Sequence, residues 1–355
     1  MNKIEWLMQN LPAQTDAMLI SSEQNRRYYT GFKSSAGILF VTRKAAYFLI
    51  DFRYYEAAKQ VIKGCEILLL EDTKKQLAEL CTKHKVKRAA LENSYVTLSE
   101  AERYRKILGD VCVTADDCAD RLVLRQRRIK TTDELQKIKA AQKLTEETFD
   151  YIIKRISAGK TEKEIALDME FFMRRQGAEA VSFDFIVVSG KNSSKPHGVP
   201  TDKKIENGDF ITMDFGAIYD GYHSDMTRTV AVGSVTERQK HLYETVLTAQ
   251  SLAIDAISLG EKCSEIDAAA RSYIYSCGYE GCFGHGLGHS LGVEIHEEPR
   301  FSALCPDLVE PGLVMTVEPG IYLEGEFGCR IEDMVYITEN GPENLTHSPK
   351  NLIVL

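Results

Sequence analysis

The sequence lacks the patterns that mark membrane, secreted or nucleic-acid-binding proteins. No stretch approaches roughly 18 uninterrupted apolar residues, so we expect no membrane-spanning helix and no membrane partner. Residues 1–16 lack the apolar run of a signal peptide. Lys and Arg number 44 against 52 Asp and Glu, a formal net charge of −8. Because phosphate binding needs clustered positive charge, this mild acidity argues against nucleic acid as a partner.

Paired cysteines are also missing. The 9 cysteines form no C-x-x-C pair, and the closest two are Cys277 and Cys282, so zinc-knuckle and redox motifs have no support. Scattered cysteines of this kind indicate a reducing compartment, in which they serve as small apolar residues. We therefore expect a cytoplasmic protein.

The first third of the chain alternates short apolar runs with amphipathic stretches, which is typical of an α/β domain. The apolar runs predict strands at residues 17–21, 37–41, 46–50, 66–70 and 88–91. The amphipathic stretches predict helices at residues 52–62, 72–84 and 98–108. A basic segment, residues 121–130, follows and is interpreted as a solvated connector. We place the domain boundary in it, between residues 125 and 126.

Two helix-start signals open the region beyond the connector. Thr131-x-x-Glu134 and Thr161-x-x-Glu164 are capping boxes that precede amphipathic stretches, and the second helix is expected to stop at Gly177. Two further helices are predicted at residues 236–258 and 264–277. Strands are predicted at residues 183–189, 210–218, 225–232, 313–317 and 330–338. The order helix, helix, strands therefore occurs twice.

The two halves of this region also resemble each other in sequence, which indicates an internal repeat. Ile156-Ser157-x-Gly159 recurs as Ile257-Ser258-x-Gly260, and residues 208–216 align with residues 312–320. The blocks are separated by a small insertion in the second half. We therefore interpret residues 131–355 as two similar halves around a pseudo-twofold axis.

The repeat also pairs the acidic residues of the two halves. Asp214 aligns with Glu318, and each is followed by a turn and a second acid, Asp225 and Glu332. A lone acid in an apolar strand is costly unless it is paired or binds a cation. Four converging carboxylates repel one another, and divalent cations such as Mn²⁺, which prefer carboxylate oxygen, would relieve that repulsion.

The turn between the first two acids predicts how they face each other. Asp220-Gly221 is a strong signal for a two-residue hairpin. With that turn, residue 214 opposes residue 227, and Asp214 and Asp225 then lie on the same face as diagonal neighbours. The two glutamates of the second half can be related similarly across their own turn.

Histidines gather in one glycine-rich segment, residues 284–296. Three of the 8 histidines lie there, namely His285, His289 and His296, and His197 in Pro196-His197-Gly198 is a fourth candidate. The glycines allow tight turns and close backbone approach. No G-x-G-x-x-G or Walker pattern is completed. A lone histidine is more often a core residue than a ligand, but a glycine-flanked cluster leaves both interpretations open.

These motifs together resemble the pita-bread metallopeptidases (M24), and within them the Xaa-Pro branch, prolidase and aminopeptidase P. The matching motifs span nearly all of residues 126–355 in the family's order. They are Ser189-Gly190, Pro196-His197-Gly198, Met213-Asp214-Phe215-Gly216, Ser224-Asp225-Met226-Thr227-Arg228-Thr229, Gly288-His289-x-x-Gly292-x-x-x-His296-Glu297, Thr316-Val317-Glu318-Pro319-Gly320 and Arg330-Ile331-Glu332-Asp333. The first domain matches more loosely, through segments around Ser21, Tyr29 and Asp51, and looks like the N-terminal domain of creatinase and Xaa-Pro peptidases.

The resemblance implies a fold class and a metal centre. The fold would be α/β (α+β), with a small creatinase-like N-terminal domain, residues 1–125, before a pseudo-twofold duplicated pita-bread catalytic domain, residues 126–355. The family's dinuclear centre implies two divalent metal ions, Mn²⁺ in the first place and Co²⁺ or Zn²⁺ otherwise. Its five ligands fall at the motif positions of Asp214, Asp225, His289, Glu318 and Glu332.

The resemblance also implies a reaction at this centre. Two adjacent metals can lower the pKa of a shared water and hold it as hydroxide for attack on the carbonyl before proline. Glu318 would accept the proton while remaining a ligand, and His197 or His296 would bind substrate and stabilise the oxyanion. Tyr322 and Arg330 are further substrate-binding candidates.

Several alternatives stay open. Creatinase shares the fold without this metal set, and methionine aminopeptidase usually lacks such an N-terminal domain. We favour a prolidase, which must grip the substrate's C-terminal carboxylate; Arg300 could do so, although a surface arginine competes with that interpretation. Aminopeptidase P, acting on longer peptides, is the first alternative, and a non-catalytic pita-bread interaction module is the second. The implied partners are short proline-containing peptides and a second copy of the chain in a homodimer.

Overall fold

The computed structural model describes residues 2–355. They form two compact units, one ending at Arg127 and one running from Arg128 to Leu355. Among the described helices, none combines the length and apolarity that crossing a bilayer requires.

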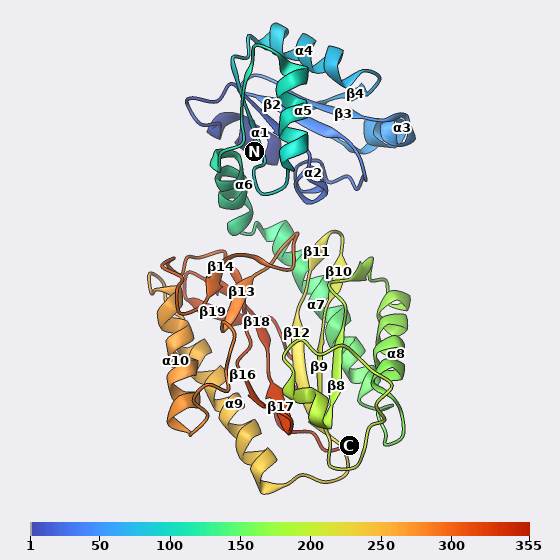
Figure 1. Cartoon of the computed structure of the whole chain (residues 1–355), viewed down its shortest axis with the longest axis vertical. Coiled ribbons are helices and arrows are strands. Elements are labelled where there is room, and N and C mark those ends of the chain that lie inside the picture. Colours follow the sequence, from blue (N-terminus) through green and yellow to red (C-terminus); the bar gives the residue numbers. More distant parts are fainter. Residues whose placement is uncertain (1) are drawn as a thin grey trace. The chain divides into compact units, whose positions relative to one another are not determined.

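The first unit is built on a six-stranded sheet in the order β4-β3-β2-β1-β5-β6 (Figure 1). The strands are β1 (Ala17–Ile20), β2 (Ile38–Thr42), β3 (Ala46–Ile50), β4 (Glu66–Leu69), β5 (Arg88–Leu91) and β6 (Cys112–Thr114). β1 pairs antiparallel with β2 and parallel with β5, so the sheet is mixed. Strands β1 to β3 are buried along their whole length, as expected for continuous apolar runs in a covered sheet.

Six helices accompany this sheet. They are α1 (Lys3–Asn10), α2 (Glu23–Thr30), α3 (Phe52–Val61), α4 (Thr73–His84), α5 (Leu98–Leu108) and α6 (Cys118–Arg128). The helices predicted at residues 52–62, 72–84 and 98–108 are confirmed to within one residue at each end. α2 was not predicted, because its sequence is mostly polar and it buries Arg26, Tyr28 and Tyr29 rather than an aliphatic stripe.

The basic segment at residues 121–130 is not the solvated connector that the sequence predicts. α6 occupies most of it, and Arg127 and Lys130 are only 4% and 5% exposed. Arg127 donates to Asn25 Oδ1 at 2.8 Å, and Lys130 Nζ donates to Glu297 Oε2 at 3.0 Å. Buried charges of this kind are tolerated because they are hydrogen-bonded or paired with an opposite charge. Both partners lie far along the chain, where a count of local charges cannot find them.

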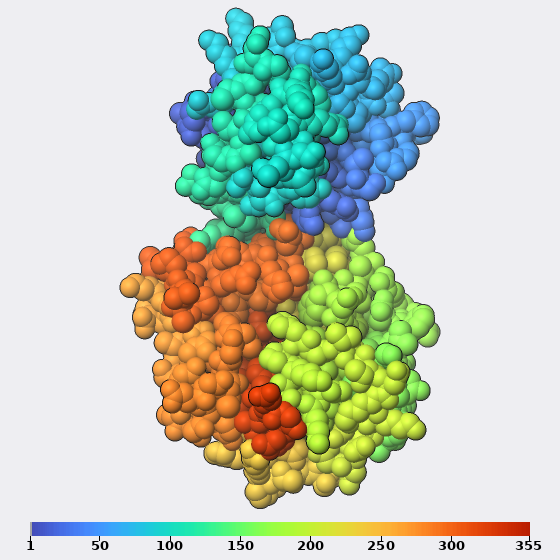
Figure 2. All heavy atoms as spheres, in the orientation of Figure 1, coloured from blue at the N-terminus to red at the C-terminus, as the bar shows by residue number. Residues whose placement is uncertain are grey.

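The second unit consists of two halves with the same order of elements (Figure 1). In the space-filling view the first half (yellow-green) and the second half (orange) lie side by side (Figure 2). In the first half, α7 (Thr132–Ile152) and α8 (Glu162–Arg175) precede β8 (Ile186–Ser189), β9 (Phe210–Phe215) and β12 (Met226–Ala231). β8 and β12 flank β9 in one sheet. A small sheet joins β7 (Ala180–Val181), β10 (Ala217–Tyr219) and β11 (Tyr222–His223). Both predicted capping boxes are present.

In the second half, α9 (Glu237–Ala256) and α10 (Cys263–Ser276) precede a five-stranded sheet in the order β14-β13-β15-β18-β19. Its strands are β13 (Gly288–Ser290), β14 (Glu297–Phe301), β15 (Val314–Val317), β18 (Asp333–Thr338) and β19 (Gly341–Asn344). β16 (Gly320–Leu323) and β17 (Phe327–Arg330) form a separate hairpin. Each half has its own apolar core between helices and strands. The strands of both halves lie between the two helix pairs (Figure 1).

The strand register agrees with the prediction made from the turns. Asp220 and Gly221 have φ values of 45° and 79°, the positive values that a tight hairpin turn requires, and Asp214 pairs with Thr227. In the second half, Val317 pairs with Asp333 and Gly320 pairs with Arg330. The same register continued between these pairs leaves Glu318 and Glu332 opposite each other.

Candidate active site

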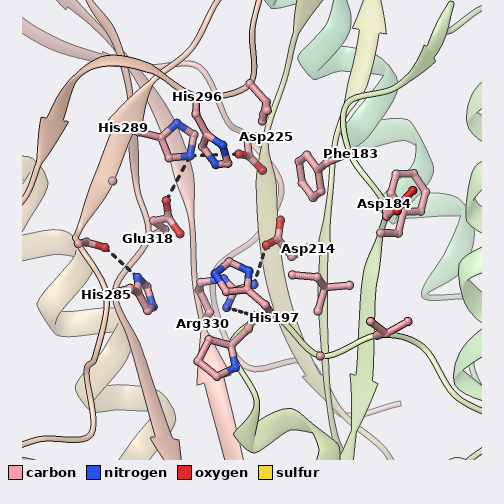
Figure 3. A pocket seen from close by; sticks show the side chains of 18 of the residues that line it. Phe183, Asp184, His197, Asp214, Asp225, His285, His289, His296, Glu318 and Arg330 are labelled. Atoms are coloured by element: carbon pink, nitrogen blue, oxygen red, sulfur yellow. Dashed lines mark hydrogen bonds and ion pairs between the residues drawn. The ribbon is translucent and has the colours of Figure 1, made fainter. Parts of the chain in front are cut away.

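Four acids from the ends and joints of strands come together between the two halves. Asp214 lies in β9, Asp225 directly before β12, and Glu332 between β17 and β18; their oxygens lie within 4.8 Å of one another. These three residues are 9%, 5% and 1% exposed. Glu318, directly after β15, joins them, so each half supplies two acids; Figure 3 shows Glu318 across from Asp214 and Asp225. The repeat therefore brings together the acids that the sequence pattern pairs.

His289 in β13 joins these acids through one ring nitrogen. Its Nε2 lies 3.4 Å from Glu318 Oε1 and 3.6 Å from Asp225 Oδ2. Its Nδ1 lies 3.0 Å from the Ser290 carbonyl oxygen, which places the ring proton on Nδ1. Burial, reinforced by His296, lowers the pKa of His289 to about 3. The neutral ring therefore presents the lone pair of Nε2 to the carboxylates, as a metal-ligating histidine does.

Three carboxylate oxygens of the acidic cluster are buried and accept no hydrogen bond. Oδ1 of Asp214, Oδ1 of Asp225 and Oε1 of Glu332 are buried without a hydrogen-bond partner. Burial, with repulsion from the neighbouring acids, raises the pKa of Asp225 and Glu332 well above their usual range, and burial raises the pKa of Glu318 to about 8. Buried anionic oxygens without donors cost several kcal/mol. Divalent cations would meet this demand, and four carboxylates with one imidazole suit hard or borderline ions.

Arg330 holds one edge of the acidic cluster. Its guanidinium donates to Asp214 Oδ2 at 2.6 Å, to the Tyr322 hydroxyl at 2.7 Å and to Thr227 Oγ1 at 3.1 Å. Because arginine only donates, the Tyr322 oxygen accepts here and directs its own proton to His285 Nε2, 2.9 Å away. Burial lowers the pKa of His285 to about 4, so the ring is a neutral acceptor. A continuous chain of hydrogen bonds thus runs from His285 to Asp214.

A cavity of about 770 Å³ opens onto this cluster. Eight of the residues predicted for the site line it: Asp214, Asp225, His289, Glu318, His197, His296, Arg300 and Arg330. Glu332 and Tyr322, both described by the structure, are not on its wall. The His296 ring packs edge-on against His289, with centroids 4.5 Å apart. Arg300 in β14 is half exposed, and its Nε contacts Glu298 Oε1 at 3.3 Å.

Comparison with known proteins agrees with this geometry. Residues 136–339 match the model of metallopeptidase family M24, and residues 7–129 match the creatinase/prolidase N-terminal domain. The chain belongs to metallopeptidase family M24. The two family matches confirm the predicted fold class, a creatinase-like N-terminal domain followed by an M24 catalytic domain.

Several relatives of this M24 chain cover almost its whole length. The Xaa-Pro dipeptidase of Pyrococcus furiosus is 37% identical over 86% of this chain and 80% of its own. A solved Xaa-Pro dipeptidase from Bacillus anthracis is 40% identical, with a TM-score of 0.95 over 99% of both chains. A solved X-Pro aminopeptidase from Thermotoga maritima is 38% identical, with a TM-score of 0.92 over 100% of both chains.

Two threonines that hold the acids of the M24 site were not predicted from the sequence. Thr227 Oγ1 donates to Glu332 Oε2 at 2.7 Å. Thr316 Oγ1 donates to Glu318 Oε1 at 3.1 Å and accepts the His289 backbone N–H at 3.0 Å. Each threonine lies two residues from an acid, so strand alternation puts it on the same face. That spacing is the signal that could have found them.

Part of the cavity wall was not predicted either. Phe183, Phe185, Val199 and Ile295 add apolar side chains to the lining, together with Asp184. Phe183 and Asp184 lie across the site from Glu318 (Figure 3). Phe185 is 8% exposed and Val199 76%, so these side chains share a place on the wall and not a degree of burial. Their place depends on how the loops fold over the strands, and no local pattern in the sequence marks it.

Proposed function

We propose that this M24 chain is a dinuclear-metal peptidase that hydrolyses the Xaa-Pro bond at the N-terminus of dipeptides or short peptides. The observation that carries the proposal is the cluster of buried, unsatisfied carboxylates with His289 at the wall of a peptide-sized cavity. Relatives named Xaa-Pro dipeptidase and X-Pro aminopeptidase support the substrate class.

Asp214, Asp225, His289, Glu318 and Glu332 would hold two divalent metal ions. We propose Mn²⁺ as the physiological metal, with Co²⁺ and Zn²⁺ as alternatives, because the set is dominated by carboxylate oxygen. When bound, such ions polarise a peptide carbonyl and lower the pKa of a shared water.

The chain's own groups would then orient the substrate and move one proton. Glu318 is the acid best placed to accept a proton from water in the cavity, because its side chain is 17% exposed, against 13% for Asp214 and 7% for Asp225. His197 and His296 line the same cavity and can donate hydrogen bonds to the carbonyl oxygen on which charge develops. Burial, reinforced by Arg300, lowers the pKa of His296, so it would donate as a neutral ring. Tyr322 would act indirectly, by holding the Arg330 guanidinium in place with its hydroxyl.

The choice between dipeptidase and aminopeptidase depends on how the site binds the C-terminal end of the substrate. Arg300 lines the cavity with a half-exposed guanidinium, which suits it to bind the C-terminal carboxylate of a dipeptide. We therefore propose an Xaa-Pro dipeptidase. An Xaa-Pro aminopeptidase is the second candidate, because an X-Pro aminopeptidase structure is almost as similar.

A substrate panel tests the proposal and separates the two candidates. Xaa-Pro dipeptides, Xaa-Pro-Yaa tripeptides and Xaa-Ala dipeptides would be compared by product chromatography with the Mn²⁺-loaded chain. A dipeptidase releases proline fastest from Xaa-Pro, whereas an aminopeptidase prefers the tripeptide. Lack of hydrolysis of every proline peptide would contradict both and leave a non-catalytic interaction module.

We further propose residues 1–125 as the creatinase-like domain and residues 126–355 as the catalytic domain of a cytoplasmic homodimer. The nine cysteines are all free, which supports a reducing compartment. The dimer rests on the resemblance to this family. Light scattering coupled to gel filtration tests it, and a single 39.9 kDa species would contradict it.

A further inference from the structure

His197 lies on neither a helix nor a strand. It belongs to the loop of residues 189–201, which leaves β8, forms a short 3-10 turn (Gly190–Ser194) and returns toward β9. Pro196, His197 and Val199 from this loop line the cavity. A group that must meet substrate from a loop depends on contacts that keep the loop in place.

One carboxylate closes both ends of this loop. Glu162 Oε1 accepts hydrogen bonds from the Ser189 backbone N–H at 2.6 Å and from Ser189 Oγ at 2.9 Å. Glu162 Oε2 accepts from the Thr201 backbone N–H at 2.9 Å and from Thr201 Oγ1 at 2.7 Å. Asn192 Nδ2 lies 3.2 Å from each of the two oxygens. The two oxygens of one side chain therefore join loop residues that are far apart in sequence.

The middle of the loop is fixed to the other half of the unit. The Gly328 backbone N–H donates to Ser193 Oγ at 2.9 Å, and Ser193 is 1% exposed. A Cβ at Gly328 would lie 2.4 Å from the Ser193 carbonyl oxygen, so the two backbones are in close contact. Arg330 donates to the Pro196 carbonyl oxygen at 3.2 Å. His197 thus follows a residue that is bonded to the same arginine as Asp214.

Glu162 takes no part in the capping box of the helix that carries it. It is 0% exposed at the first position of α8, while the capping box of α8 is made by Thr161 and Glu164. A buried carboxylate is costly unless its lone pairs are satisfied, and here the loop supplies the donors. The positive end of the helix dipole also favours a negative charge at this position. The capping box would remain with another residue there, whereas the loop would lose the carboxylate that bonds both Ser189 and Thr201. The Lys163 backbone N–H, 3.2 Å from the Thr201 carbonyl oxygen, would be left to hold that end.

We propose that Glu162 is a positioning residue that closes the loop of residues 189–201 and thereby holds His197 against bound peptide. The inference rests on the proposed function, since it concerns the same cavity. It predicts that Glu162 acts on substrate affinity through the loop, and on neither the metal site nor the α8 helix.

Glu162→Gln, compared with the matched control Glu164→Gln, tests this. The amide that replaces the Glu162 carboxylate would place an N–H₂ group against the donors of Ser189 or Thr201. The same change at residue 164 removes a negative charge from the first turn of α8 but keeps an oxygen that can accept the Thr161 backbone N–H. For Glu162→Gln we expect KM for an Xaa-Pro dipeptide to rise about tenfold, with kcat changed less than about threefold. For Glu164→Gln we expect both constants to stay within about twofold of wild type.

Hydrogen exchange on the substrate-free chain gives an independent readout. The amides of residues 189–201 should exchange faster in Glu162→Gln than in wild type, with no such change in Glu164→Gln, and bound Mn²⁺ should be unchanged. Thr201→Val removes the hydroxyl that donates to Glu162 and accepts from Asn192 and from the Lys203 backbone N–H, but it keeps the bond from the Thr201 backbone N–H to Glu162. It is the milder variant and should raise KM about threefold in the same direction.

The outcomes separate the two proposals. An inactive wild-type chain would overturn the proposed function and this inference with it. An active wild type whose KM is the same in Glu162→Gln and Thr201→Val would overturn this inference alone. Equal effects of Glu162→Gln and Glu164→Gln on KM would also overturn it, because the cause would then be the helix.

Discussion

Arg330 donates a hydrogen bond to Oδ2 of Asp214 at 2.6 Å, while Oδ1 of the same carboxylate is buried without a partner. The two oxygens of Asp214 therefore have different neighbours. One is held by Arg330, and the other lacks a partner that a cation would supply. Arg330 also keeps the Tyr322 hydroxyl and Thr227 in place, so it joins three elements of the site.

Replacement of Arg330 by Lys should impair the site although the charge is kept. A lysine ammonium cannot reproduce the planar set of donors that reaches Asp214, Tyr322 and Thr227 together. Loss of contacts that orient ligands typically costs about 10- to 100-fold in metal affinity or activity. Isothermal titration with Mn²⁺ and turnover of an Xaa-Pro dipeptide measure the two effects. Wild-type values for both would contradict the role given to Arg330.

Tyr322→Phe should lower stability and turnover through its neighbours. The hydroxyl accepts from Arg330 and donates to His285, so its removal leaves one N–H of Arg330 and Nε2 of His285 without that partner, at a cost of about 1–3 kcal/mol. Tyr336→Phe is the control, because the Tyr336 hydroxyl has no hydrogen bond with any described residue. Urea unfolding of both variants measures the difference. Equal stabilities would show that the Tyr322 hydroxyl does not link Arg330 to His285.

The buried ion pair of Lys130 and Glu297 should stabilise the histidine segment. The two side chains are 1% and 2% exposed, and the Glu297 carboxylate also accepts the backbone N–H of Val293. Lys130→Met leaves a buried carboxylate without its cation and should cost about 3–5 kcal/mol. Adding Glu297→Gln should recover part of that loss, since the partner charge is then gone. Denaturant unfolding checks both steps, and strictly additive losses would contradict the coupling.

Stability of the metal-free chain should fall as the pH rises from about 6.5 to about 8. Burial raises the pKa of Glu318 from 4.5 to about 8 and raises the pKa values of Asp225 and Glu332 in the same direction. A folded pKa above the unfolded one means that the folded chain holds the proton more tightly. That stabilisation is fully present below the unfolded pKa and is lost as the pH rises through the folded pKa.

At pH values below this window the buried histidines affect stability in the opposite direction, so that stability falls as the pH falls. The pKa values of His285 and His289 are lowered from 6.5 to about 4 and about 3, so the unfolded chain gains protons first as the pH falls below 6.5. Above that pH the carboxylates dominate, and Mn²⁺, which keeps them ionised, should flatten the profile. Scanning calorimetry with and without Mn²⁺ measures this. A metal-free Tm that rises over the window would contradict the account.

Arg300→Ala should distinguish a dipeptidase from an aminopeptidase. If the guanidinium binds the C-terminal carboxylate of Xaa-Pro, its loss should lower kcat/KM on the dipeptide by about 100-fold, the size of a lost charge-assisted contact. Turnover of an Xaa-Pro-Yaa tripeptide should change far less. Equal losses of kcat/KM on the two peptides would contradict the proposal that Arg300 binds the C-terminal carboxylate.

Much of the site could be predicted because its residues lie in local patterns. The Asp220-Gly221 turn specifies which residue faces Asp214, and the repeat specifies which acid of the second half is its counterpart. Resemblance to the family's motifs, rather than spacing, distinguished His289 from His285, and the structure places only His289 beside the acids among these two.

Residues whose role depends on distant partners could not be predicted. The sequence predicts that Lys130 belongs to a solvated basic segment, whereas in the structure it is buried and paired with Glu297. Glu162 looks like an ordinary acid in the first turn of a helix, and nothing in the sequence of residues 189–201 indicates that Ser189 and Thr201 bond to it. In both cases contacts with residues distant in sequence determine whether the side chain is buried, and the local composition does not predict these contacts.

Calorimetric titration of the metal-free chain with Mn²⁺, combined with an assay of proline release from an Xaa-Pro dipeptide on the same samples, tests the central claim most directly. The account predicts two ions bound per chain and proline release that rises as the sites fill. It also predicts that Glu332→Gln weakens binding and abolishes release. Failure to bind Mn²⁺, or proline release that is equally fast after the metal has been removed, would contradict it.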